Sequence, residues 1–107
     1  MAFYELRQYK VLPGKLEGWV RIMEEEIIPF QISQGMVICG SFQGETDPSV
    51  YIWLRRFESE AQREQLYKAV YESEFWKTQI APKVPDYLER GASVITRMVP
   101  TAKSTVQ

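Results

Sequence analysis

Two segments of the chain alternate charged and aromatic residues in a way that could form a binding site. Side chains two positions apart on a β-strand point to the same face of a sheet. In residues 3–9, Glu5 and Arg7 share one phase, and in residues 50–57 one phase holds Tyr51, Trp53 and Arg55. If the two segments pair, these five side chains converge on one surface.

The residue types on this surface suit an acidic aromatic ligand. Aromatic rings supply contact area, and an arginine guanidinium binds a carboxylate with two parallel hydrogen bonds. We therefore predict that the ligand-binding residues are Arg7, Tyr51, Trp53 and Arg55. Glu5 is the candidate general base if the protein is an enzyme. The alternative is structural, because arginine and tyrosine at a sheet–sheet interface also form ion pairs and hydrogen bonds between subunits.

The absence of histidine excludes several kinds of catalytic site. The chain has no histidine and one cysteine, so it cannot form a Ser-His-Asp triad, a Cys-His pair or a histidine-based zinc or haem site. It also lacks a glycine-rich phosphate-binding loop. We expect no metal and no cofactor. Cys39 is predicted to be a small buried apolar residue rather than a reactive thiol.

Composition further limits the partners. The formal net charge is −1, and the 13 basic residues form no run that could follow a nucleic-acid backbone. No apolar stretch approaches the roughly 18 residues of a membrane span. We expect a cytoplasmic protein that binds neither nucleic acid nor membranes.

The predicted elements follow the order β-α-β-β-α-β. Strands are predicted over residues 3–9, 36–45, 50–57 and 93–99 from their alternation and their flanking turns. Leu16 begins an amphipathic helix that should end near Pro29, and Ser59 with Gln62 forms a capping box for the second helix. This order is that of the ferredoxin-like α+β fold. It predicts a four-stranded antiparallel sheet, in the order 4-1-3-2, with both helices on one face.

The second face of such a sheet needs a cover. We expect the aliphatic Val50, Ile52 and Leu54 to pack under the helices, which would leave the aromatic and charged phase on the open face. An open face that carries Phe3, Tyr51, Trp53 and Phe57 is too apolar for a soluble monomer. We therefore expect a C2 homodimer formed by sheet-to-sheet packing.

Several short motifs in this order resemble the NIPSNAP family. They are YELRQY at 4–9, PGKLEGW at 13–19, GSFQGE at 40–45, YIWLRRFES at 51–59, SEFW at 73–76 and RMVPT at 97–101. The resemblance implies a dimeric α/β barrel over residues 1–101, followed by a polar C-terminal tail at 102–107. It implies no particular reaction, cofactor or catalytic residue.

Three functions are compatible with these observations. The first is a homodimeric barrel that binds a small aromatic or apolar acid. The second is a cofactor-independent enzyme, similar to a monooxygenase or an isomerase, with Glu5 as base and Arg7 or Arg55 stabilising an oxyanion. The third is a structural or interaction protein without a small ligand.

Overall fold

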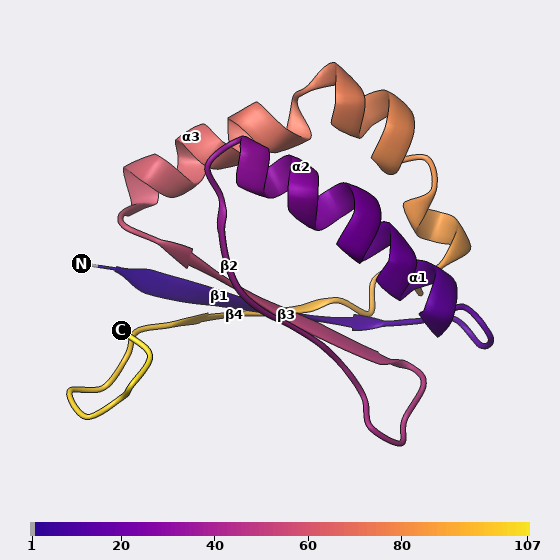
Figure 1. The fold of residues 1–107 in the computed structure, drawn as a ribbon, viewed down its shortest axis with the longest axis horizontal. Helices are drawn as coiled ribbons and strands as arrows, with labels where there is room; N and C mark the ends of the chain where they lie inside the picture. The colour runs from indigo at the N-terminus through magenta and orange to yellow at the C-terminus, as the bar shows by residue number, and fades with distance from the viewer. Residues whose placement is uncertain (1) are drawn as a thin grey trace.

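The fold has two layers, a four-stranded antiparallel sheet and helices that cover one of its faces (Figure 1). It is known from a computed structural model that describes residues 2–107. The strands are β1 (Phe3–Lys10), β2 (Val37–Gln43), β3 (Val50–Phe57) and β4 (Val94–Met98). The helices are α1 (Leu16–Ile22), α2 (Ile28–Ser33) and α3 (Glu60–Tyr71), with shorter segments η1 (Met23–Ile27), η2 (Trp76–Ile80) and η3 (Val84–Asp86).

The sheet has the strand order β2-β3-β1-β4, and each neighbouring pair is antiparallel. β2 and β3 form a hairpin, and β1 lies between β3 and β4. The predicted α+β class with a four-stranded antiparallel sheet is confirmed.

The sequence predicted that the first helix ends near Pro29, but the helical region continues past this residue. α1 continues through the π-helical segment η1 into α2, which ends at Ser33. In η1 the N–H of Ile28 donates to the carbonyl of Met23, five residues earlier. Pro29 stands in the first turn of α2. A proline has no N–H to donate, and the first turn after a change in helical pitch accommodates it more easily than a helix interior does.

The capping box of α3 is confirmed. The Gln62 N–H donates to Ser59 Oγ at 3.1 Å, and the Gln62 side chain accepts from the Glu58 N–H at 2.7 Å. Ser73 also caps the next helical turn, since the Trp76 N–H donates to its Oγ at 3.1 Å. These caps fix the path of the chain above the sheet.

The prediction of which side chains face the helices was wrong. On β3 the buried residues are Tyr51, Trp53, Arg55 and Phe57, and β1 pairs with it so that Glu5 faces Arg55 and Arg7 faces Trp53. Trp19 of α1 packs edge-on against Tyr51, and two tyrosines of α3 hydrogen-bond to Arg55. The aromatic and charged phase therefore lies under the helices.

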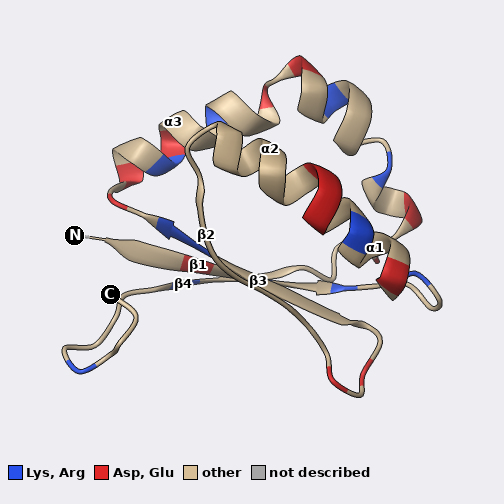
Figure 2. Ribbon diagram, in the orientation of Figure 1, with Lys and Arg blue, Asp and Glu red and all other residues tan. Residues whose placement is uncertain are grey.

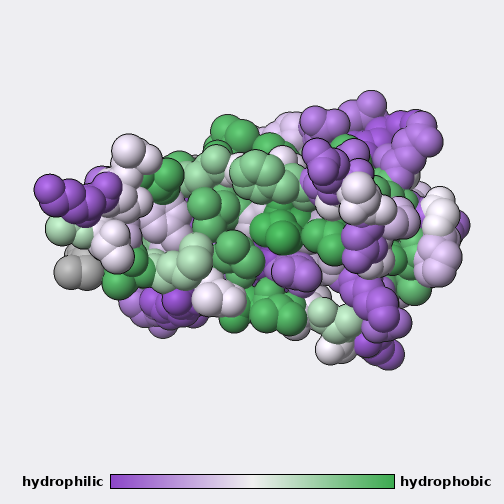
Figure 3. All heavy atoms as spheres, turned by 90° about the horizontal axis from the view of Figure 1, so that it is seen from below, coloured by the Kyte–Doolittle hydropathy of each residue, from purple (hydrophilic) through white to green (hydrophobic). Residues whose placement is uncertain are grey.

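The open face of the sheet carries the aliphatic phase instead. Ile52 and Leu54 of β3 lie on it with Leu6 of β1, and Phe42 of β2 and Val94 of β4 are more than half exposed there. Seen from below the sheet, hydrophobic side chains extend across the middle of this face (Figure 3). The apolar surface that the sequence predicted on the open side is thus present, but other residues form it.

Two details of this side differ from expectation. Cys39 is exposed on the edge strand β2, beside a bulge between Ile38 and Gly40, and is not buried. The predicted C-terminal tail turns back beneath the sheet, where Val106 and Ser104 lie near Tyr4 and Leu54. Arg56 Nε donates to the carbonyl of Gln107 at 2.9 Å and holds the tail there.

Lys and Arg are interspersed with Asp and Glu over the helices and loops (Figure 2). No helix within residues 2–107 has the length and apolar character needed to span a bilayer. The cytoplasmic location remains a prediction.

Candidate functional site

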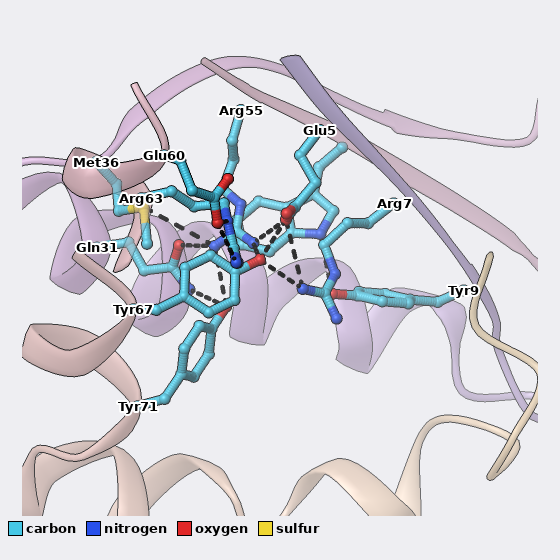
Figure 4. Close-up of polar contacts among 11 residues, drawn as sticks. Glu5, Arg7, Tyr9, Gln31, Met36, Arg55, Glu60, Arg63, Tyr67 and Tyr71 are labelled. Carbon is cyan, nitrogen blue, oxygen red and sulfur yellow. Dashed lines mark hydrogen bonds and ion pairs between the residues drawn. The ribbon is translucent and has the colours of Figure 1, made fainter. Parts of the chain in front are cut away.

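A buried ion cluster lies between the sheet and the helices (Figure 4). Arg55, on β3, has no exposed surface. Its Nη2 donates to Glu5 Oε1 at 2.5 Å and to the Tyr67 hydroxyl at 2.8 Å. Its Nη1 donates to Gln31 Oε1 and to the Tyr71 hydroxyl, each at 2.9 Å. Strand β1 thus supplies the countercharge, and α2 and α3 supply the neutral acceptors.

Arg7 adds a second positive charge to this cluster. Its Nη1 lies 3.5 Å from Glu5 Oε1 and 3.2 Å from the Tyr67 hydroxyl. Its Nε is buried and has no hydrogen-bond partner among residues 2–107. One carboxylate cannot neutralise two guanidinium groups, which both remain charged at any physiological pH. The cluster therefore carries a net positive charge, and it is greatest at Arg7 because Glu5 lies 1 Å closer to Arg55.

Glu5 is held as a carboxylate and is poorly suited to act as a base. Its Oε1 accepts from Arg55 and from the Tyr67 hydroxyl, each at 2.5 Å. Burial alone would raise the pKa of Glu5, but the Tyr67 hydrogen bond and the charges of Arg55 and Arg7 outweigh burial and lower the pKa below its ordinary 4.5. The same contact and burial raise the pKa of Tyr67 to about 12, so Tyr67 remains a donor.

The lowered pKa of Glu5 predicts acid-sensitive folding. Below pH 4.5 the unfolded chain takes up a proton at Glu5 more readily than the folded protein does, so the free energy of unfolding should fall as the pH falls through that range. Urea unfolding, repeated at intervals of about one pH unit from about pH 6 to about pH 3, measures how the free energy of unfolding depends on pH. In Glu5→Gln the slope should be smaller, whereas Glu25→Gln, at an exposed helical position, should retain the wild-type slope. Equal slopes in wild type and Glu5→Gln would contradict the assignment.

A partly enclosed cavity of about 170 Å³ adjoins the ion cluster. Its walls are mostly apolar and aromatic, and among the described residues that form them Arg7 is the one that carries a charge. They comprise Arg7, Tyr9, Trp19, Met23, Ile27, Trp53, Tyr71, Trp76, Val84, Leu88 and Ser93. All three tryptophans of the chain are in this set. The cavity therefore combines an apolar, ring-lined interior with the excess positive charge.

The polar groups in the wall are mainly hydrogen-bond donors. Trp53 Nε1 donates to the Tyr9 hydroxyl at 3.0 Å, and the Tyr71 hydroxyl accepts from Arg55 and from Gln31. Both tyrosine oxygens thus accept within the protein, which leaves their protons to be donated elsewhere. Arg7 contributes a guanidinium group, which only donates, and its buried Nε has no partner among residues 2–107. A hydrogen-bond acceptor, and above all an anion, complements such a wall.

The residues predicted for the site fall into three groups. Arg7 and Trp53 line the cavity, and Glu5 and Arg55 lie in the adjoining ion cluster. Tyr51 lies behind the cavity wall. The Tyr51 hydroxyl is 2.5 Å from Ser41 Oγ, and its ring packs against those of Tyr9 and Trp19. Strand pairing thus brings Glu5, Arg7 and Arg55 together as predicted, but beneath the helices.

Sequence reasoning missed the contributions of the helices to this site. They are Trp19, Gln31, Tyr67, Tyr71 and Trp76. The spacing of Tyr67 and Tyr71, one helical turn apart, was an available signal, because such residues share one face of a helix. Gln31 carries no comparable signal in the sequence.

Among residues 2–107, no group of three or more histidine, cysteine, aspartate or glutamate side chains is placed to hold a metal ion. Although Cys39 is exposed, partial loss of water around its thiol raises its pKa.

Comparison with known proteins places the chain in a family. A NIPSNAP family model matches residues 4–103. A NIPSNAP family protein from Agrobacterium tumefaciens str. C58 is 24% identical, with a TM-score of 0.88 over 100% of both chains. An uncharacterized NIPSNAP-like domain protein from Burkholderia xenovorans is 18% identical, with a TM-score of 0.85 over 96% of this chain and 88% of the other. A conserved protein from Methanosarcina mazei Go1 is more distant in structure, with 18% identity and a TM-score of 0.68 over 94% of each chain.

These solved structures support the α+β fold, and another from Agrobacterium tumefaciens is described as a NIPSNAP family protein with unknown function. Comparison with curated protein sequences finds no match. Since the family model covers nearly the whole chain, the chain belongs to the NIPSNAP family.

Proposed function

We propose that this protein is a homodimeric α/β barrel that binds a small aromatic carboxylate in the cavity between the sheet and the helices. The observation that carries the proposal is the surplus positive charge of Arg7 in an otherwise apolar, ring-lined cavity. Keeping a charge in a partly buried site is unfavourable unless it is paired. An anionic ligand supplies the missing partner.

The chemistry and size of the cavity define the ligand further. The aromatic side chains of Tyr9, Trp53, Tyr71 and Trp76 favour a flat apolar body. A protein cavity of about 150 Å³ holds benzene, and this one measures about 170 Å³. A single-ring carboxylate matches both properties, and benzoate is the simplest probe.

The test is calorimetric titration of benzoate into the wild type and into Arg7→Gln. For a ligand of this size we expect a dissociation constant on the order of 0.1 mM. A charged hydrogen bond contributes about 1.5–3 kcal/mol, so Arg7→Gln should bind benzoate at least about tenfold more weakly.

Arg21→Gln is the matched control, because Arg21 is exposed on α1 and its ion pair, with Glu17, is 3.6 Å long. It should bind benzoate like the wild type. Benzamide, which has the same shape without the charge, should bind the wild type as weakly as benzoate binds Arg7→Gln. Equal affinities of wild type and Arg7→Gln for benzoate would overturn the proposal.

The apolar open face of the sheet supports the homodimer. A second copy placed sheet to sheet covers Leu6, Phe42, Ile52, Leu54 and Val94, which one chain leaves partly or mostly exposed. Contiguous apolar surface of this kind is uncommon on soluble monomers. The helices and their cavities then lie on the outside of the barrel, where a ligand reaches them without dissociating the dimer.

A further inference from the structure

The indole of Trp19 is a buried donor that finds no partner in the described part of the chain. Trp19 belongs to α1, is 2% exposed and lines the cavity. Its Nε1 has no hydrogen-bond partner within residues 2–107. An indole nitrogen only donates, and a buried donor that is left unpaired costs free energy. In contrast, Trp53, on the same cavity, donates its N–H to the Tyr9 hydroxyl at 3.0 Å.

Trp19 and Arg7 are linked through a common neighbour in the wall. The Tyr9 ring packs edge-on against Trp19 with 5.9 Å between ring centroids, and the Arg7 guanidinium carbon lies 5.7 Å from the Tyr9 centroid. Arg7 and Trp19 thus lie on either hand of Tyr9 as a charged and a neutral donor residue of the same cavity wall.

The Tyr9 hydroxyl is a second uncharged hydrogen-bond donor in this wall. Its oxygen already accepts from Trp53, so its proton is the part left to interact. Burial raises the pKa of Tyr9, which keeps that proton in place. The wall therefore holds two uncharged donor groups, the Trp19 N–H and the Tyr9 O–H. An uncharged acceptor on a ligand would complement them.

We infer that the natural ligand is a single-ring carboxylate that carries a second, uncharged hydrogen-bond acceptor, an ether or carbonyl oxygen, which the Trp19 indole N–H binds. This inference rests on the proposed function: Arg7 binds the carboxylate, and Trp19 recognises the substituent at a distance from it. A site built to hydrogen-bond an oxygen discriminates against an analogue of equal shape that lacks the oxygen.

Methoxybenzoates and ethylbenzoates test the inference because the two substituents differ only by an oxygen in place of a methylene. Both the 3- and the 4-substituted pairs are titrated calorimetrically into the wild type and into Trp19→Phe. In the wild type, one methoxybenzoate should bind about fivefold more tightly than its ethyl counterpart, as a neutral hydrogen bond predicts. In Trp19→Phe, which keeps an aromatic ring but no donor, that preference should disappear.

A second readout does not depend on the folding of the variant. In a ¹⁵N–¹H NMR spectrum of the wild type, the preferred methoxybenzoate should move the Trp19 indole signal downfield, and its ethyl counterpart should not. If benzoate binds but neither methoxybenzoate exceeds its ethyl counterpart, or if the preference survives in Trp19→Phe, the inference is wrong and the proposed function stands. If benzoate itself fails to bind, both are wrong.

Discussion

Replacing Arg55 with alanine is expected to lower the free energy of unfolding by about 3–5 kcal/mol, the usual cost of breaking a buried ion pair by removing one partner. Arg55 has no exposed surface and donates to Glu5, Gln31, Tyr67 and Tyr71. Its removal leaves the Glu5 carboxylate buried with the more distant Arg7 as its remaining cation, 3.5 Å away. It also removes the guanidinium group that stacks 4.6 Å from the centre of the Trp53 ring.

Urea unfolding at neutral pH and a fixed protein concentration measures this effect. Arg21→Ala is the control, because its exposed side chain makes one ion pair within a helix, and it should change the free energy of unfolding by less than about 0.5 kcal/mol. A loss below about 1 kcal/mol in Arg55→Ala would show that the cluster is not the structural centre of the fold.

Replacing Ile52 with glutamate is expected to convert a dimer to a monomer. Ile52 lies on the open face between Gln8 of β1 and Phe42 of β2. On dimerisation the two glutamates, one from each copy, would lose their water without gaining a partner. The free-energy cost of this desolvation is far larger than the contribution of one apolar contact. Sedimentation velocity at micromolar concentration measures the mass of the particle in solution.

Ile32 provides a matched control on the opposite layer. It is 54% exposed on α2, away from the open face, so Ile32→Glu should remain dimeric. The fold of Ile52→Glu should survive, because the helices and the core beneath them do not contact this face. A monomeric wild type, or a dimeric Ile52→Glu variant, would refute sheet-to-sheet dimerisation.

The elements of the fold were predictable because each has a strong local signal. β3 has the predicted bounds, since alternation and a preceding turn cluster define it. The Ser59 cap was equally clear, because its hydrogen-bonding partner lies three residues away. The continuation of the first helix past Pro29 was not predictable, because it depends on the π-helical segment before the proline.

The face of the sheet that the helices cover could not be read from strand alternation. Both phases of β3 are suited to burial, one by aliphatic side chains and one by rings and an arginine. The outcome depends on groups distant in sequence: Tyr67, Tyr71 and Gln31 accept hydrogen bonds from the two Nη atoms of Arg55, which lowers the cost of burying its phase. The aliphatic phase is then left on the open face of the sheet.

The candidate site was predictable only in part for the same reason. Strand pairing was enough to bring Glu5, Arg7 and Arg55 together. Both arginines leave a buried Nε without a partner among residues 2–107, and they differ in their distance to Glu5, which is 2.5 Å for Arg55 and 3.5 Å for Arg7. No sequence pattern contains that difference, which places the surplus charge at Arg7.

The most direct test of the binding site uses the three tryptophans, because all of them line the cavity and the chain has no others. In a ¹⁵N–¹H spectrum each contributes one indole signal. Benzoate should shift the signals of Trp19, Trp53 and Trp76 along a single saturable curve, and in Arg7→Gln the same shifts should require at least about tenfold more benzoate. Three indole signals that stay in place up to about 10 mM benzoate, a hundredfold above the affinity expected for such a ligand, would contradict the account.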